Sequence, residues 1–231
     1  MQPGPVLPRE KPARDRISLR RVKGAGRAAA YDGAMVDRRT LLLSLAVAVP
    51  PLVLAAVGVT HPTDLTPQSA EYWRDLHIGI LAIFPLLGFA PWLIVRGHRL
   101  WLSWTAGALG LIYAAFYTAL DVLSGIGAGG LEHAGMHEST PVVFGLGSDL
   151  GDIGSYAFIA ACALAAGFSV RWVGLRAVPG SVLVLAGSLL FLTRHIYFPL
   201  GVVGQLCLAA GWVAIVVALR VRRARQVQAA E

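Results

Sequence analysis

One acidic side chain, Asp121, continues a polar stripe with Tyr113 and Tyr117 inside a long apolar run. The spacing is i, i+4 and i+8, so a helix places all three side chains on one face. An acid at membrane depth normally faces the interior of a helix bundle and needs a partner. The candidate partners at the same predicted level are Arg74, His77, Arg194 and His195. These seven residues form the predicted ligand-binding site, in which a pair such as Asp121–His195 could also exchange protons. A structural Asp–Arg or Asp–His clasp is the alternative.

A second group suited to chemistry is the segment EHAGMHE, in which His133 and His137 are four residues apart. A helical turn would direct both imidazoles the same way. Neutral imidazole is a good ligand for zinc or copper, and the Met136 thioether would favour Cu(I). The motif is not HExxH, and two histidines do not close a site. A third ligand would have to come from His61, His77, His195 or Asp149.

Haem is a third possibility, because membrane cytochromes hold it between histidines on facing helices. Only His77 and His195 are predicted within spans, so one haem is the most that they could hold. Cys162 and Cys207 each lie inside an apolar run without a CxxC partner, which is typical of buried free cysteine. We find no phosphate-binding glycine motif and no catalytic serine or cysteine pattern. The sequence thus predicts no cofactor firmly, with zinc or copper ahead of haem, and it predicts no nucleic-acid partner.

Composition identifies the elements that must position these residues. The 231 residues are 56% hydrophobic and 14% charged, whereas soluble domains average about 25% charged residues. The apolar residues come in runs of roughly membrane length, so the surplus must face lipid. Eighteen arginines against two lysines, with abundant Ala, Gly and Val, indicate a GC-rich genome. We therefore expect a bacterial all-α integral membrane protein, with the lipid bilayer as its first partner.

Six transmembrane helices are predicted from the apolar runs. They cover about 41–60, 75–95, 101–123, 153–174, 178–194 and 199–220. Prolines should kink two of them, at Pro50-Pro51 in the first and at Pro85 and Pro91 in the second. Asp75 and Asp152 would then lie in first helical turns, where an acid stabilises the helix.

Small residues recur every four positions in two of these spans. The stripes are Ala106, Gly110, Ala114 and Thr118, and then Ala157, Ala161 and Ala165. This spacing lets helix backbones approach closely, so we interpret both stripes as packing seams. The segment 124–151 has eight glycines and no Lys or Arg. It is expected to be a flexible solvated loop, or else its PVVFGL part dips back into the membrane under a cover of protein or water.

The distribution of positive charge predicts the orientation. Eighteen of the twenty Lys and Arg residues fall on the side of the two termini, and only Arg74 and Arg194 fall on the other. The positive-inside rule then predicts a protein of the cytoplasmic (inner) membrane with both termini in the cytoplasm. Residues 1–34 read as a disordered basic tail or as a gene start placed too early, since Met35 opens an ordinary membrane-protein start. Residues 35–225 form the transmembrane domain, and 226–231 form a short cytoplasmic tail.

Histidines and acids gather on the predicted outer face. Five of the six histidines lie there: His61, His77, His133, His137 and His195. Eight of the thirteen acids do so as well: Asp64, Glu71, Asp75, Asp121, Glu132, Glu138, Asp149 and Asp152. The leading hypothesis is a six-helix protein whose outer His/Asp-rich site binds a small ligand or a metal ion. The alternatives are a small-molecule transporter, a membrane-embedded enzyme acting on lipid or quinone, and a structural subunit without a site. A homo-oligomer is compatible with all of these, and the sequence does not decide whether the protein is an enzyme.

Overall fold

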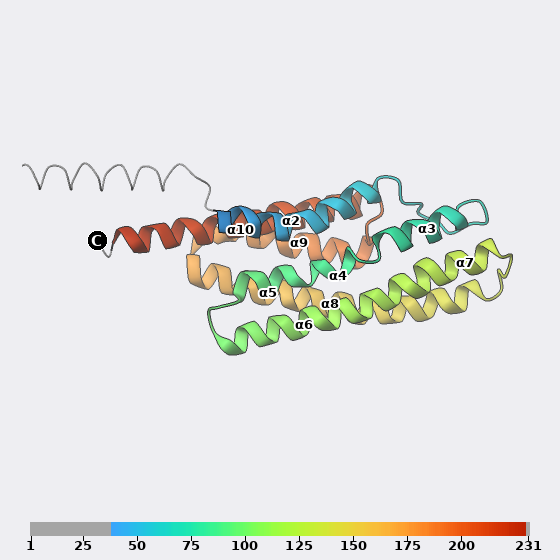
Figure 1. The fold of residues 1–231 in the computed structure, drawn as a ribbon, viewed down its shortest axis with the longest axis horizontal. Coiled ribbons are helices and arrows are strands. Elements are labelled where there is room, and N and C mark those ends of the chain that lie inside the picture. The colour runs from blue at the N-terminus through green and yellow to red at the C-terminus, as the bar shows by residue number, and fades with distance from the viewer. Residues whose placement is uncertain (1–37, 230–231) are drawn as a thin grey trace, which may run out of the picture. The chain divides into compact units, whose positions relative to one another are not determined.

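The computed structural model describes residues 38–229, and within them it contains helices and no strand. The predictions for the 1–34 tail and for the last two residues fall outside this range. The residues from Leu42 onward form one compact unit by their internal contacts, and this unit contains the helix bundle. Figure 1 shows the helices α2 (Arg38–Gly58), α3 (Ala70–Ile80), α4 (Phe84–Leu87), α5 (Phe89–Val95), α6 (Leu100–Leu120), α7 (Ala128–His133), α8 (Thr140–Val173), α9 (Val178–Arg194) and α10 (Leu200–Gln228). A π-helical segment, η1 (Asp121–Gly127), joins α6 to α7, and a 3-10 turn, η2 (Leu175–Ala177), precedes α9.

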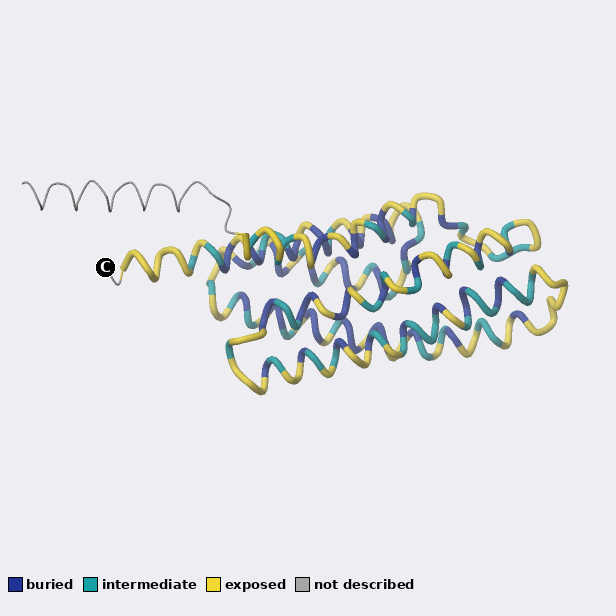
Figure 2. Tube along the Cα trace, viewed as in Figure 1, coloured by how far each residue is buried: buried dark blue, intermediate teal, exposed yellow. Residues whose placement is uncertain are grey.

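The prediction of an all-helical fold is confirmed for the described residues, and the length and composition of the helices fit the predicted membrane protein. Five helical stretches in the described part of the chain are long and apolar enough to cross a membrane. A sixth is obtained if α3 and the α4–α5 stretch, which meet at an angle of 44°, count as one broken span. Large apolar side chains such as Leu100, Trp104 and Leu111 are more than two-thirds exposed. Figure 2 shows buried residues where helices face one another and exposed residues on their outward sides, as lipid contact requires.

The bend in the second span occurs where its first proline predicts it. Pro85 has no N–H, and its ring clashes with the carbonyl four residues earlier. The helix accordingly stops at Ile80 and restarts at Phe84. Pro50 and Pro51 behave differently, because both are buried inside α2, and α2 continues through them. The prediction of a kink is therefore correct for Pro85, while the first pair lies within one helix.

The prediction for segment 124–151 is wrong: the segment is neither a flexible loop nor a re-entrant one. Helical structure continues from α6 through η1 and α7 to His133, and α8 begins at Thr140. Figure 1 shows α7 continuing α6 while α8 returns alongside both. The glycines lie where neighbouring groups approach closely: Gly125 contacts the His77 ring, and Gly147 contacts Ser124. Glycine serves here as a packing residue between helices, as it often does in membranes.

Two aspartates predicted in first helical turns lie in mid-helix instead, because both helices begin earlier than their apolar runs. Helix α3 begins at Ala70, so Asp75 is its sixth residue, and α8 begins at Thr140, twelve residues before Asp152. The apolar runs locate the lipid-facing parts of these helices and miss their polar extensions. Glu71 is the acid that occupies the first turn of α3.

Most of the small residues predicted as packing seams lie in the core, while Ala114 and Thr118 are half-buried. Ala157, Ala161 and Ala165 are buried along α8. Gly110 of α6 lies directly against Gly88, the residue between α4 and α5. Cys162 is a buried free thiol and Cys207 a half-buried one. Close packing of α6 and α8 thus fixes the helix face that carries Tyr113, Tyr117 and Asp121.

Candidate functional site

Three histidines from different parts of the chain meet at one place. His61 lies in the link between α2 and α3, His77 lies in the last turn of α3, and His195 directly follows α9. One ring nitrogen from each lies within 4.8 Å of those of the other two. The Nε2 atoms of His61 and His77 are 3.5 Å apart. We call these three residues the histidine cluster.

The hydrogen bonds of two rings fix which nitrogen carries the proton. The Nδ1 atom of His61 lies 2.7 Å from the Pro62 carbonyl oxygen, and that of His77 lies 2.7 Å from the Trp73 carbonyl oxygen. A carbonyl can only accept, so both Nδ1 atoms carry hydrogen. The facing Nε2 atoms of the neutral rings therefore present lone pairs, which cannot hydrogen-bond each other. Histidines that bind metals are commonly oriented in this way by a carbonyl on the far nitrogen.

His195 is held by both its side chain and its backbone. Its Nδ1 is 2.5 Å from the Tyr117 hydroxyl, and its ring stacks on Phe84 with centroids 5.2 Å apart. Its φ of +49° is unusual for a residue other than glycine. Such conformations cost of order 1–3 kcal/mol and persist where the surroundings impose them. The turn at the end of α9 thus brings this ring to the cluster at an energetic cost.

Asp121 lies beside the cluster as a buried carboxyl group. It is 0% exposed, and its Oδ1 is 3.8 Å from His77 Nε2. Neither carboxyl oxygen has a hydrogen-bond partner within residues 38–229, and the hydroxyl of buried Tyr113 also has none there. A buried charge without compensating partners is costly, so it usually pairs or binds a metal. Asp121 also opens the π-helical η1, and short π-helical segments are frequent at functional sites.

Contacts between α3, η1 and α8 keep His77 against Asp121. The Trp73 indole Nε1 donates to the Ser124 carbonyl at 3.1 Å, which ties α3 to η1. The Ser124 hydroxyl donates to the Phe144 carbonyl at 2.8 Å, which ties η1 to α8. Gly125 has no side chain, so the His77 ring can lie directly on the η1 backbone.

The surroundings of His61 and His195 favour the neutral forms of their rings. Burial lowers the pKa of His61, and the hydrogen bond to Pro62 offsets part of that shift. Burial lowers the pKa of His195 strongly, and the positive forms of His61 and His77 would lower it further. A histidine must be neutral to bind a metal, so both pKa shifts favour the form that can bind one.

A hollow of about 220 Å³ reaches the cluster between α6, α8 and α9. Polar and aromatic side chains line it, among them His77, Tyr117, Ser148, Asp152 and His195. Water or a small polar group fits in this volume. The site is therefore accessible from one side while Asp121 behind it is buried.

Five of the seven predicted ligand-binding residues lie in or beside the cluster: His77, Tyr113, Tyr117, Asp121 and His195. The two arginines do not pair with Asp121. Arg74 binds its neighbour Asp75, with Nη2 2.7 Å from Oδ1, and Arg194 is exposed at the end of α9. Both arginines stay where water solvates them, which is cheaper than burying a guanidinium group.

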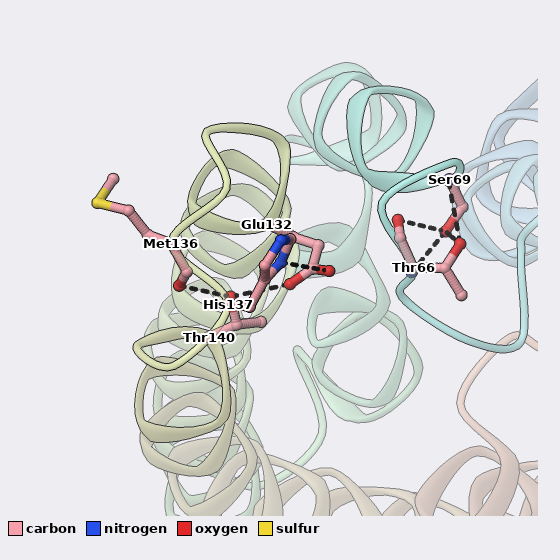
Figure 3. A network of polar contacts seen from close by, with 6 residues as sticks. All are labelled: Thr66, Ser69, Glu132, Met136, His137 and Thr140. Carbon is pink, nitrogen blue, oxygen red and sulfur yellow. Dashed lines mark hydrogen bonds and ion pairs between the residues drawn. The ribbon is translucent and has the colours of Figure 1, made fainter.

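The predicted His133, His137 and Met136 set does not share a helical turn. Helix α7 ends at His133, and Gly135 turns the chain with φ +76°. Figure 3 shows His137 directed at Glu132, with Nδ1 2.9 Å from Oε1, while the Met136 side chain points away from both. Figure 3 also shows Thr140 held by the Glu132 carboxylate, and the Thr66–Ser69 contacts that precede α3. These contacts stabilise the turns that flank α3 and α8.

His61 is the cluster member that the sequence placed only among possible third ligands. The only sequence signal for His61 was the accumulation of histidines on one predicted face. No spacing rule links a residue in a loop to residues in α3 and after α9.

Comparison with protein-family models, with curated proteins and with solved structures found no match for this chain.

Proposed function

We propose that this protein is a membrane metalloprotein that binds one divalent transition-metal ion through His61, His77 and His195, with Asp121 beside them. The observation that carries the proposal is the meeting of three imidazole nitrogens within 4.8 Å of one another. It is supported by the two fixed tautomers and by the unpaired carboxyl group 3.8 Å from His77. The outer ligand site predicted from sequence then becomes a metal site.

Zinc is the ion that these ligands favour. Three ligating imidazole nitrogens, with a carboxylate beside them and no sulfur, suit Zn²⁺ and argue against Cu(I). Haem suits the geometry less, because the His61 ring lies edge-on to both others, at centroid distances of 5.0 and 5.7 Å. Three protein ligands leave a coordination position open, as in catalytic zinc sites. The hollow beside His195 gives water or a small substrate a route to that position. Zinc in such a site would supply an activated water molecule for hydrolysis.

We also propose the arrangement in the membrane, with six spans, both termini in the cytoplasm and the histidine cluster toward the outside. Its support is the excess of arginine near the termini and the α5–α6 and α8–α9 links, compared with Arg74 and Arg194 at the other ends of the spans. A cytoplasmic membrane of a bacterium is the setting in which that rule applies directly.

Metal content tests the proposed site. The untagged full chain, purified in mild detergent without chelator, is expected to carry about one zinc ion per chain by elemental mass spectrometry. His61→Ala and His77→Ala should each lose it, since two remaining imidazoles bind zinc far more weakly than three. The His133→Ala/His137→Ala double variant is the matched control, and it should keep its zinc. Wild-type protein that stays metal-free after incubation with zinc, or metal that leaves with His133 and His137, would refute the proposal.

The Asp121→Asn variant separates the role of the carboxylate. Asparagine keeps the shape and removes the charge, so zinc affinity should fall about 10–100-fold, as for other groups that support ligating histidines. Competition with a fluorescent zinc chelator measures this change. Unchanged affinity would show that Asp121 takes no part in metal binding.

A further inference from the structure

A separate hollow lies at the opposite ends of α6 and α8 from the histidine cluster. Its volume is about 680 Å³, and it lies between the start of α6 and the last turns of α8. Its walls are mostly apolar, with Trp101, Leu102, Leu164 and Phe168 among them. His98, Arg99 and Arg171 supply its polar edge. An apolar wall with a basic edge is suited to a molecule that has both an apolar chain and a negative charge.

Within residues 38–229, no carboxylate balances the basic edge. Every Asp and Glu in the described range 38–229 lies between residues 64 and 152, in the α2–α3 link, α3, η1, α7, the α7–α8 turn or the N-terminal part of α8. None of the ion pairs in that range includes Arg99 or Arg171. The charges at this end must therefore be neutralised by something other than the described side chains.

Helix α10 adds further positive charge beside the hollow. The Arg222 guanidinium lies 4.5 Å from the centre of the Trp172 ring, which lines the hollow, and the buried Arg222 Nε has no hydrogen-bond partner in the described range. Burial and the nearby Arg223 both lower the pKa of His98, which packs on Phe168 and Trp172. Both effects favour the neutral form of His98, so the arginines supply most of the positive charge of the edge.

We propose that this hollow binds an anionic phospholipid of the membrane leaflet that it faces. The phosphate lies at Arg99 and Arg171, and an acyl chain lies along the Trp101 and Phe168 side of the cavity. Free phosphate would engage only the arginines and leave the apolar wall empty, which is why a lipid is the better fit. Basic pockets between spans on the cytoplasmic side commonly bind such headgroups. This proposal does not depend on the metal site.

Native mass spectrometry of the full-length protein in detergent tests the proposal. Phosphatidylglycerol and phosphatidylcholine with identical acyl chains are added in equal amounts, and the retained lipid is counted. We expect one phosphatidylglycerol per chain to bind at least tenfold more tightly than phosphatidylcholine. Millimolar inorganic phosphate should compete weakly, because it lacks the acyl chain. Equal retention of the two lipids, or displacement by phosphate alone at comparable concentration, would overturn the proposal.

Charge variants locate the site. Arg99→Gln/Arg171→Gln should weaken phosphatidylglycerol binding by about 25-fold, from roughly fivefold for each arginine near the membrane surface. The control is Arg96→Gln/Arg176→Gln, which removes the same charge at the same end from residues that do not line the hollow. Equal losses in both double variants would reduce the effect to general electrostatics and refute a site. All four positions lie outside the core, and a monodisperse elution profile checks that each variant is folded.

Discussion

His195 brings a ring to the histidine cluster from a backbone conformation that only glycine adopts easily. Its φ is +49° and its ψ is −125°. Replacing it with alanine keeps that strain and removes the imidazole, whereas glycine removes both. In chelator, His195→Gly should therefore be more stable than His195→Ala by about 1 kcal/mol. Thermal unfolding of the two variants in the same detergent measures the difference.

His195→Gly and His195→Ala both lack the imidazole, and with it the hydrogen bond to Tyr117 and the metal ligand. The difference in their stability therefore reports the backbone strain alone. His98→Gly against His98→Ala is the matched pair at a position for which no positive φ is found. It should show no advantage for glycine. An alanine variant at position 195 as stable as the glycine variant would mean that the turn after α9 is unstrained.

At the residue scale, helical periodicity was sufficient to place Asp121 with Tyr113 and Tyr117. It also led to His77 and His195, because an acid at that depth needs a partner nearby. It could not assign His61, whose position depends on how the α2–α3 link folds back. The prediction that an arginine could pair with Asp121 was wrong, and for Arg74 the reason is local. Asp75 is next to Arg74 in the chain, and the two side chains pair with each other in water.

At the scale of the elements, the contact of α3 with η1 depends on one missing side chain. A Cβ added at Gly125 would overlap the His77 ring, which is itself buried. Gly125→Ala should therefore destabilise the protein by about 1–3 kcal/mol, as overpacking does. It should also displace His77 from the cluster and lower the zinc content well below one per chain. Elemental analysis and thermal unfolding measure the two effects.

Gly130→Ala in α7 is the matched control. A Cβ there would meet no atom within 4 Å, and alanine is the better helix former by about 1 kcal/mol. This variant should keep its zinc and be as stable as the wild type or slightly more so. If Gly125→Ala behaved in the same way as Gly130→Ala, the proposed role of η1 in holding His77 would be excluded.

The same glycines explain why the segment 124–151 could not be predicted correctly. Glycine weakens an isolated helix, so eight of them without an apolar repeat predict a loop. In a bundle, the gain from close approach exceeds that loss, but it exists only where a neighbour is present. The neighbours of Gly125 and Gly151 are His77 of α3 and Leu120 of α6. Local sequence patterns carry no information on these contacts between separate helices. The long apolar helices were predictable because the length of an apolar run is a local property of the sequence.

At the scale of the whole chain, the two candidate sites lie at regions of opposite charge. The histidine cluster adjoins the segments that hold the described carboxylates, and the apolar hollow adjoins arginines of α8 and α10. A membrane with an anionic inner leaflet would orient the arginine-rich end toward the cytoplasm. The phospholipid would then bind from inside, and the metal site would open outward.

Cysteine labelling tests this orientation. Cys162 and Cys207 are replaced by alanine, and one new cysteine is introduced as Ala134→Cys in the exposed turn after α7 or as Arg176→Cys in the exposed η2 turn. A membrane-impermeant maleimide applied to intact cells should label Ala134→Cys. It should label Arg176→Cys only after lysis, because a guanidinium-rich link remains on the cytoplasmic side. The reverse labelling pattern would show the opposite orientation in the membrane, with the histidine cluster facing the cytoplasm. Cytoplasmic zinc buffering would then set the zinc occupancy of the cluster. Labelling of both positions in intact cells would place both turns on one side, which is incompatible with α8 as a single span.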